Sequence, residues 1–182
     1  MTETLWTIQT EEAFAVLQRT GVLRTDPERL LFGGEFRAAY DWMAAQMCRR
    51  VGPPPVGVAY PVWAWYQWEG RRKRMDLRRS GYAPRGTPMV QLTFEADPRE
   101  FLRSDFDAWH LVLGRDYIAD SERDWEQFRA AGGDASTSWD KIFDLTRHTP
   151  GWDCAPEERS IQATLWELKL SQVRKAEHFI AK

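Results

Sequence analysis

The sequence of 182 residues predicts a compact α+β fold with a mixed or antiparallel sheet and flanking helices. Segments with the apolar pattern of strands alternate irregularly with segments of helical spacing, so the regular strand-helix-strand repeat of a doubly wound sheet is missing. Hydrophobic residues make up 43% and charged residues 29%, a balance typical of globular chains. A chain of this length buries one core without disulfides, and we expect a single domain over residues 1–182.

The first unit that the sequence predicts is a strand over residues 5–9 followed by a helix. Thr10 is a favourable N-cap for this helix, and two glutamates after it suit the positive end of the helix dipole. Phe14 and Leu17 mark the apolar face, and Gly21 is a natural C-terminal stop.

The clearest helical pattern covers residues 35–50. One stripe of this helix is apolar, and we expect it to pack on the core; it consists of Phe36, Tyr40, Met43 and Met47. The proline run in residues 52–55 ends the helix, and we expect a rigid loop there.

Two strands and a loop follow in the middle of the chain. Residues 61–68 are rich in aromatic side chains and predict a strand. Residues 70–88 are basic, contain several glycines and prolines, and predict an exposed loop. Residues 90–95 alternate between apolar and polar side chains, which again indicates a strand.

The second half of the chain predicts three helices. Ser104 and Asp107 have the spacing of a capping box, which predicts a helix carrying Phe106 and Trp109. Residues 121–131 and 138–145 predict two short helices separated by a glycine-containing loop.

A strand and a helix are expected at the end of the sequence. Residues 161–168 have the composition of a strand. Ser171 is then expected to cap a C-terminal helix that turns Val173, Ala176 and Ile180 inward.

The most informative stretch for function is an aromatic strand that leads directly into a basic loop. Trp63, Trp65 and Tyr66 are followed by a run of cations, which are Arg71, Arg72, Lys73, Arg74, Arg78 and Arg79. Flat rings beside fixed positive charge suit a nucleotide, a dinucleotide or a nucleic-acid strand. A strand buried on both faces and a solvated loop, partly neutralised by Glu69 and Asp76, explain the same residues without a ligand.

The net charge, the absence of standard motifs, and the histidines and cysteines limit which ligands and locations the sequence predicts. The net charge is −2, so the basic run is a local feature, which acts within about 8–10 Å at physiological salt. The sequence contains no dinucleotide-binding glycine motif, phosphate-binding loop or hydrolase elbow. His110, His148 and His178 lack metal-ligand spacing, and we expect no metal. Cys48 and Cys154 fit free thiols, and no apolar run reaches about 18 residues, so we expect a cytoplasmic protein without a membrane partner.

Two polar residues in the predicted last strand are candidate catalytic residues. Glu167 lies in an otherwise uncharged strand, and an inward carboxylate there needs a partner and often marks a site. If Glu167 faces solvent at the strand end, it has no such significance. Gln162 offers both ends of its amide for hydrogen bonds with a ligand.

Four segments resemble a bacterial family that is known as domain of unknown function 3841. They are LWTIQT with GVL at residues 5–10 and 21–23, WAWYQWEG at 63–70, SDFD with WH at 104–110, and IQAT with WELK at 161–169. The resemblance covers nearly the whole chain and implies one shared fold.

The opening of the chain also resembles DarT-type ADP-ribosyltransferases. Those enzymes begin with a strand bearing His and Thr, a helix and a Gly-Leu-Leu segment, and the same frame runs here from Leu5 to Leu23 without a gap. Thr7 stands at the position of the family's His and Gln9 at that of its Thr. The later strand order is similar, and the region matching the family's catalytic Glu offers Gln162, Thr164 or Glu167.

This second resemblance implies roles for several residues. Thr7 and Gln9 would contact the ribose and the nicotinamide amide of NAD, and Glu167 would stabilise the oxocarbenium-like transition state. The stacking of the nicotinamide ring would fall to Trp63, Trp65 and Tyr66. The basic loop would bind the pyrophosphate or the phosphates of a target.

Three functions therefore remain open from the sequence. The first is an NAD-dependent transferase that modifies a nucleic acid or a protein. The second is a non-catalytic module that binds nucleotides or single-stranded nucleic acid. The third is a protein-interaction module that uses a surface rich in tryptophan, of which the chain has ten.

Overall fold

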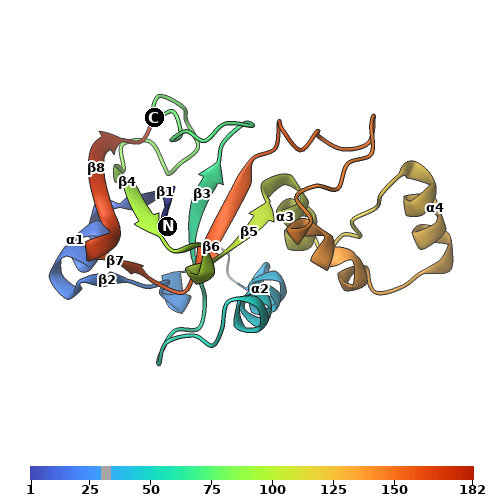
Figure 1. The fold of residues 1–182 in the computed structure, drawn as a ribbon, viewed down its shortest axis with the longest axis horizontal. Coiled ribbons are helices and arrows are strands. Elements are labelled where there is room, and N and C mark those ends of the chain that lie inside the picture. The colour runs from blue at the N-terminus through green and yellow to red at the C-terminus, as the bar shows by residue number, and fades with distance from the viewer. Residues whose placement is uncertain (30–33) are drawn as a thin grey trace.

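The computed structural model describes residues 1–29 and 34–182 and contains a six-stranded antiparallel sheet. Its strand order is β5-β6-β3-β1-β4-β8 (Figure 1). The strands are β1 (Glu3–Thr10), β3 (Val62–Gln67), β4 (Pro88–Ala96), β5 (Phe101–Asp105), β6 (Ile161–Leu165) and β8 (Val173–Ile180). A separate pair joins β2 (Val22–Leu23) to β7 (Leu168–Lys169). The predicted α+β class with an antiparallel sheet is confirmed.

Four α-helices and one longer 3-10 helix accompany the sheet in the described part of the chain. They are α1 (Glu11–Thr20), α2 (Arg37–Arg50), α3 (Phe106–Leu113), α4 (Glu122–Ala131) and the 3-10 helix Ala135–Phe143. The predicted ends of α1 are confirmed, because the Thr10 side chain accepts a hydrogen bond from the Ala13 amide and Gly21 adopts a left-handed φ of 79°.

The strand register assigns the side chains to two faces of the sheet. Trp6 pairs with Trp65, and Trp65 pairs with Gln162, so these three residues lie on one face, which we call the aromatic face. By alternation, Leu5 and Ala64 lie on the opposite face, which we call the core face.

The main hydrophobic core lies on the core face. It combines Leu5 of β1 with Leu92 and Phe94 of β4 and Leu165 of β6, all at most 1% exposed, and Leu17 of α1 packs into the same cluster. Helix α1 therefore covers the β1-β4-β8 side of this face.

A second core covers part of the aromatic face. Met43 of α2, Trp109 of α3 and Ile142 of the 3-10 helix form one buried cluster, and Trp63 packs against it. Thr164 of β6 donates a hydrogen bond to the Met47 sulfur of α2 at 3.2 Å. Helices cover both faces of the sheet, but the residues of β3 that follow Ala64 are only partly buried.

The predicted C-terminal helix is wrong. Residues 173–180 form β8, which pairs along its length with β4, and Ile180 is 58% exposed rather than inward. Ser171 lies in a short 3-10 turn before this strand. The apolar residues fit helical spacing, but pairing with β4 satisfies a row of backbone groups that would otherwise form an open sheet edge.

Smaller differences occur at other element boundaries. Asp105, not Ser104, caps α3 through hydrogen bonds from the Asp107 and Ala108 amides, because residues 101–105 form β5, a strand that the local sequence pattern does not predict. The strand predicted over residues 161–168 ends at Leu165, and Leu168 pairs instead with Leu23. The segment predicted as a helix over 138–145 is 3-10 helical.

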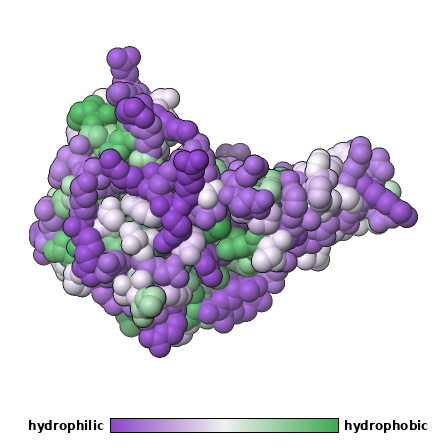
Figure 2. Space-filling view, turned by 45° about the horizontal axis from the view of Figure 1, so that its top comes forward, coloured by the Kyte–Doolittle hydropathy of each residue, from purple (hydrophilic) through white to green (hydrophobic). Residues whose placement is uncertain are grey.

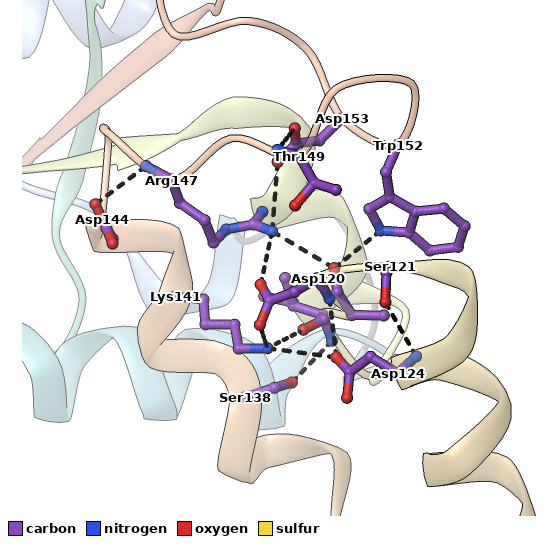
Figure 3. A network of polar contacts seen from close by, with 12 residues as sticks. Asp120, Ser121, Asp124, Ser138, Lys141, Asp144, Arg147, Thr149, Trp152 and Asp153 are labelled. Atoms are coloured by element: carbon purple, nitrogen blue, oxygen red, sulfur yellow. Dashed lines mark hydrogen bonds and ion pairs between the residues drawn. The ribbon is translucent and has the colours of Figure 1, made fainter.

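The segment that carries α4 projects from the body of the molecule (Figures 1 and 2). An ionic network holds its base: Asp120 accepts hydrogen bonds from Lys141 at 2.8 Å and Arg147 at 3.2 Å (Figure 3). Burial alone would raise the pKa of Asp120, but these two cations outweigh it and hold that pKa below its ordinary value. Arg147 also pairs with Asp153 at 3.4 Å.

Arg159 connects this network to the sheet. Its side chain is 2% exposed and forms ion pairs with Asp105 and Asp153, each at 3.3 Å. It also donates hydrogen bonds to the backbone carbonyls of Cys154, Leu145 and Arg147. The buried carboxylate of Asp105 is therefore neutralised and at the same time caps α3.

Replacing the buried arginine should destabilise the fold strongly. Arg159→Leu leaves Asp105 buried without its cation, and we expect the free energy of unfolding to fall by about 3–5 kcal/mol. Urea denaturation followed by tryptophan fluorescence measures this change. Arg99→Leu, which breaks a pair that is 89% exposed on the arginine side, is the matched control and should hardly move the midpoint. Equal midpoints for the two variants would contradict the assigned role of Arg159.

Candidate functional site

Aromatic rings gather at the end of β3 on the aromatic face. The Trp65 ring lies 4.6 Å from that of Trp68 in an edge-to-face contact and 4.8 Å from that of Phe106. Phe106 in turn contacts His110 at 4.5 Å. The first three rings are half-buried, so they keep solvent-accessible surface. We call Trp65, Trp68, Phe106 and His110 the aromatic cluster.

A β-bulge creates this cluster. The register between β3 and β6 shifts between Trp65 and Gln67, which leaves Tyr66 as the extra residue. In a regular strand Trp65 and Trp68, three positions apart, would point to opposite faces. Because of the bulge, their rings meet on the same face, and Tyr66 packs against the main core cluster instead.

The basic loop folds into a pocket beside the aromatic cluster. This basic pocket has a volume of about 520 Å³. It is lined by Trp68, Glu69, Lys73, Arg74, Met75, Asp76, Leu77, Arg78, Arg79 and Glu177. Trp68 belongs to both the cluster and the pocket, and the Arg79 guanidinium lies 5.6 Å over its ring. Flat stacking surface and positive charge are therefore continuous here.

Carboxylates neutralise most of the charge in the basic pocket. Glu69 pairs with Arg79 at 2.7 Å and Lys73 at 3.3 Å, and the hydrogen bond from Arg79 is the main reason why the pKa of Glu69 is lowered. Arg78 likewise lowers the pKa of Asp76 through its side-chain hydrogen bond. Four cations and three carboxylates line the pocket, which leaves one net positive charge. Ion pairs as exposed as these stabilise little, so a phosphate can compete for the cations.

Backbone contacts fix the start of the basic loop. The Gly70 amide and the Gln67 side chain both donate hydrogen bonds to the Arg159 carbonyl at 3.0 Å. The Glu69 amide donates to the Ser160 hydroxyl, also at 3.0 Å. Gly70 has a φ of 71°, and a Cβ there would lie 2.2 Å from the Glu157 carbonyl oxygen. Only glycine fits this close approach.

Three buried polar atoms near the cluster have no hydrogen-bond partner among the described residues. They are the Trp63 indole nitrogen, the Ser104 hydroxyl and the Gln162 amide oxygen. Trp65, Gln162 and Ser104 stand side by side across β3, β6 and β5. Buried polar atoms in native proteins nearly always have partners, and exceptions often occur at functional sites. The predicted residue Gln162 therefore lies next to Trp65, directly below the aromatic cluster.

The structure separates Thr7 and Gln9 from two of the three predicted stacking residues, Trp63 and Trp65, whereas Tyr66 packs on the core face. Thr7 is 2% exposed; its hydroxyl donates to the Trp63 carbonyl at 2.8 Å and accepts from Gln9 at 2.8 Å. The register places both side chains on the core face, whereas Trp63 and Trp65 are on the aromatic face. These hydrogen bonds occupy the Thr7 hydroxyl and connect β1 to β3. The Thr7 side chain therefore has almost no exposed surface that a ligand could contact.

Glu167 lies apart from Gln162. It follows the end of β6, and Arg24 donates two hydrogen bonds to its carboxylate at 3.0 and 3.1 Å. Gln162 lies within β6 of the large sheet, whereas Glu167 directly precedes β7, which pairs with β2 outside that sheet. The two predicted catalytic residues therefore do not meet, and Glu167 acts in the structure as the partner of Arg24.

The predicted phosphate-binding residues are divided between two places. Lys73, Arg74, Arg78 and Arg79 line the basic pocket. Arg72 instead stacks on Tyr66 at 3.6 Å, and Arg71 is exposed at the loop entrance. No sequence motif connects Phe106 or Arg103 with a ligand surface. Only the pairing of β5 with β6 brings them close to β3, and no local pattern reveals that pairing.

A family model described as a domain of unknown function, DUF3841, matches residues 4–135. The chain belongs to the DUF3841 family. The DUF3841 match includes nearly all of β1, and α1, the aromatic strand, the basic loop and α3, so the whole aromatic cluster and all of the basic pocket except Glu177 lie within it. No curated protein and no solved structure has a significant match to this DUF3841 chain.

The described part of the chain lacks two kinds of feature. Within residues 1–29 and 34–182, no group of three or more His, Cys, Asp or Glu side chains is arranged to hold a metal ion. In the same ranges, no helix combines the length and the apolar character needed to cross a membrane.

A methyl group at Gly70 should disturb the site of this DUF3841 protein. Gly70→Ala introduces both backbone strain and a clash with the Glu157 carbonyl. Gly81→Ala is the matched control, because Gly81 has a φ of 95° but open space around its Cβ position. We expect about 1–2 kcal/mol of destabilisation from strain in the control and about 1–3 kcal/mol more in Gly70→Ala. Thermal unfolding measures both; equal losses would show that the loop start tolerates displacement.

Proposed function

We propose that this protein binds single-stranded nucleic acid or nucleotides through the aromatic cluster and the basic pocket. The observation that carries the proposal is the shared position of Trp68, whose ring contacts Trp65 on one side and has the Arg79 guanidinium over it. Bases would stack on the cluster while their phosphates reach Arg79 and Lys73. Stacking on an aromatic side chain contributes about 1–3 kcal/mol per base.

The charges of the basic pocket fit this role. Phosphate would replace Glu69 as the partner of Lys73 and Arg79, which are 42% and 50% exposed. The carboxylates in the pocket repel a phosphate backbone. At low salt, nucleic acid would therefore bind less tightly here than in a groove lined only by cations, and its affinity would be moderate. Contacts of this kind do not distinguish one base from another, because every base has a π-face.

An NAD-dependent transferase stays a prediction from the resemblance to DarT-type enzymes. NAD would have to approach Thr7 and Gln9 on the core face and Trp63 and Trp65 on the aromatic face. Glu167 would also have to leave Arg24. Neither requirement applies to stacking and phosphate contacts, which is why the binding module is the better-supported function. A cytoplasmic location, which agrees with the free cysteines Cys48 and Cys154, and a protein partner also stay predictions.

Two substitutions distinguish the contribution of ring stacking to nucleic-acid binding from the contribution of positive charge. We expect Trp65→Ala to weaken the binding of fluorescent oligo(dT) or oligo(U) of about 15 nucleotides by about 5- to 150-fold. Arg79→Ala should also weaken binding and should reduce the slope of log affinity against log salt by about 0.7. Fluorescence anisotropy over a series of salt concentrations measures both effects.

Trp125→Ala is the matched control, because Trp125 is 40% exposed and lies on α4, away from the proposed surface. Its affinity should equal that of the wild type. Equal losses in Trp65→Ala and Trp125→Ala, or an affinity that ignores salt, would count against the proposal. In a parallel assay, NAD consumption by the wild type that disappears in Glu167→Ala would favour the transferase instead.

A further inference from the structure

Two arginines from distant parts of the chain share one tyrosine ring. The Arg72 guanidinium lies 3.6 Å from the centre of the Tyr66 ring, and the Arg103 guanidinium lies 4.9 Å from it. Arg72 comes from the basic loop and Arg103 from β5. Tyr66 is the extra residue of the β3 bulge and therefore points away from the aromatic cluster, towards Phe101 at 6.3 Å.

The two guanidiniums differ in how firmly they are held. Arg72 donates a hydrogen bond to the Thr4 carbonyl at 2.7 Å and lies 5.3 Å over the Trp6 ring. Arg103 is exposed and makes no hydrogen bond or ion pair with any residue that the structure describes. One arginine is therefore preorganised, and the other keeps all its donors for a ligand.

The local charge around Tyr66 is incompletely neutralised. The carboxylate nearest to Arg72 is that of Glu3, at 3.8 Å, which is a long ion pair. Burial lowers the pKa of Arg72, and the charge of Arg103 lowers it further, whereas Glu3 acts in the opposite direction. Two cations and one carboxylate give one net positive charge. The charges of two guanidiniums that contact the same ring repel each other, and a bound anion reduces this repulsion.

We propose that Tyr66, Arg72 and Arg103 form a site for a phosphate group, separate from the basic pocket. Guanidinium groups present planar pairs of donors that match phosphate oxygens, and here two of them contact the same tyrosine ring. Tyr66 also carries a phenolic hydroxyl, which is a further hydrogen-bond donor on the ring that both guanidiniums contact. This proposal does not depend on nucleic-acid binding at the aromatic cluster. Its phosphate comes either from a free phosphorylated compound or from the end of a strand.

The test uses inorganic pyrophosphate as the probe. At constant ionic strength, pyrophosphate should raise the melting temperature of the full chain, and isothermal titration should give its affinity. Arg103→Gln should weaken pyrophosphate binding by about tenfold or more, because it removes charge-assisted hydrogen bonds to the anion, while the fold loses only the contact of an exposed side chain with the Tyr66 ring. Arg123→Gln, which removes an exposed cation from α4, is the matched control and should bind as the wild type does.

Other outcomes would overturn the site. If Arg103→Gln binds pyrophosphate like the wild type while Arg79→Ala loses it, the anion occupies the basic pocket and the proposal is wrong. The absence of any pyrophosphate effect beyond that of chloride at equal ionic strength would also refute it. Arg72→Gln is a second variant, but because Arg72 also anchors the loop to β1, its melting temperature without ligand must be compared first.

Oligonucleotides with and without a 5′-phosphate distinguish the two sources. Tighter binding of the phosphorylated strand that disappears in Arg103→Gln supports a site for strand ends. Equal binding of both strands, with the pyrophosphate response retained, supports a site for free phosphorylated compounds. If no oligonucleotide binds at all, the function proposed above fails, whereas the pyrophosphate titration still decides this site.

Discussion

The buried side chain and backbone of Arg159 are the contacts on which both the fold and the candidate site depend. Its guanidinium neutralises Asp105, and Asp105 caps α3, which carries Phe106. Its carbonyl accepts hydrogen bonds from Gly70 and Gln67, where the basic loop leaves β3. One residue thus sets the position of the aromatic cluster from both sides. A buried cation with several partners fixes the positions of these partners, because any donor or carboxylate left without a partner would carry a large desolvation cost.

The bulge in β3 divides the functional chemistry between the two faces of the sheet. Trp65 and Trp68 meet on the aromatic face next to the basic pocket, whereas Tyr66 turns towards Arg72 and Arg103. Both places combine an aromatic ring with a guanidinium, which is the combination that suits ligands with phosphates. The same short segment therefore supplies two surfaces of similar chemistry, and this explains why it stands out in the sequence.

Local signals predicted the parts of the fold that depend on neighbouring residues. The Thr10 cap, the Gly21 stop and the aromatic strand all follow from contacts within a few positions of the chain. The C-terminal segment was predicted as a helix because its apolar residues fit that spacing, yet its backbone pairs with β4, some eighty residues away. Glu167 was predicted to be unusual and is in fact paired with Arg24, a partner that no spacing rule identifies.

The sequence by itself determined the α+β class, the ends of α1, and the presence of an aromatic strand that is followed by a basic loop. Only the tertiary structure decided which of these groups meet. It placed Phe106 and Gln162 beside Trp65, moved Thr7 and Gln9 to the core face, and brought Arg103 to Tyr66. The physical reason is that caps and periodicity arise from short-range sterics and hydrogen bonds, whereas strand order, bulges and ion pairs arise from pairings between distant segments.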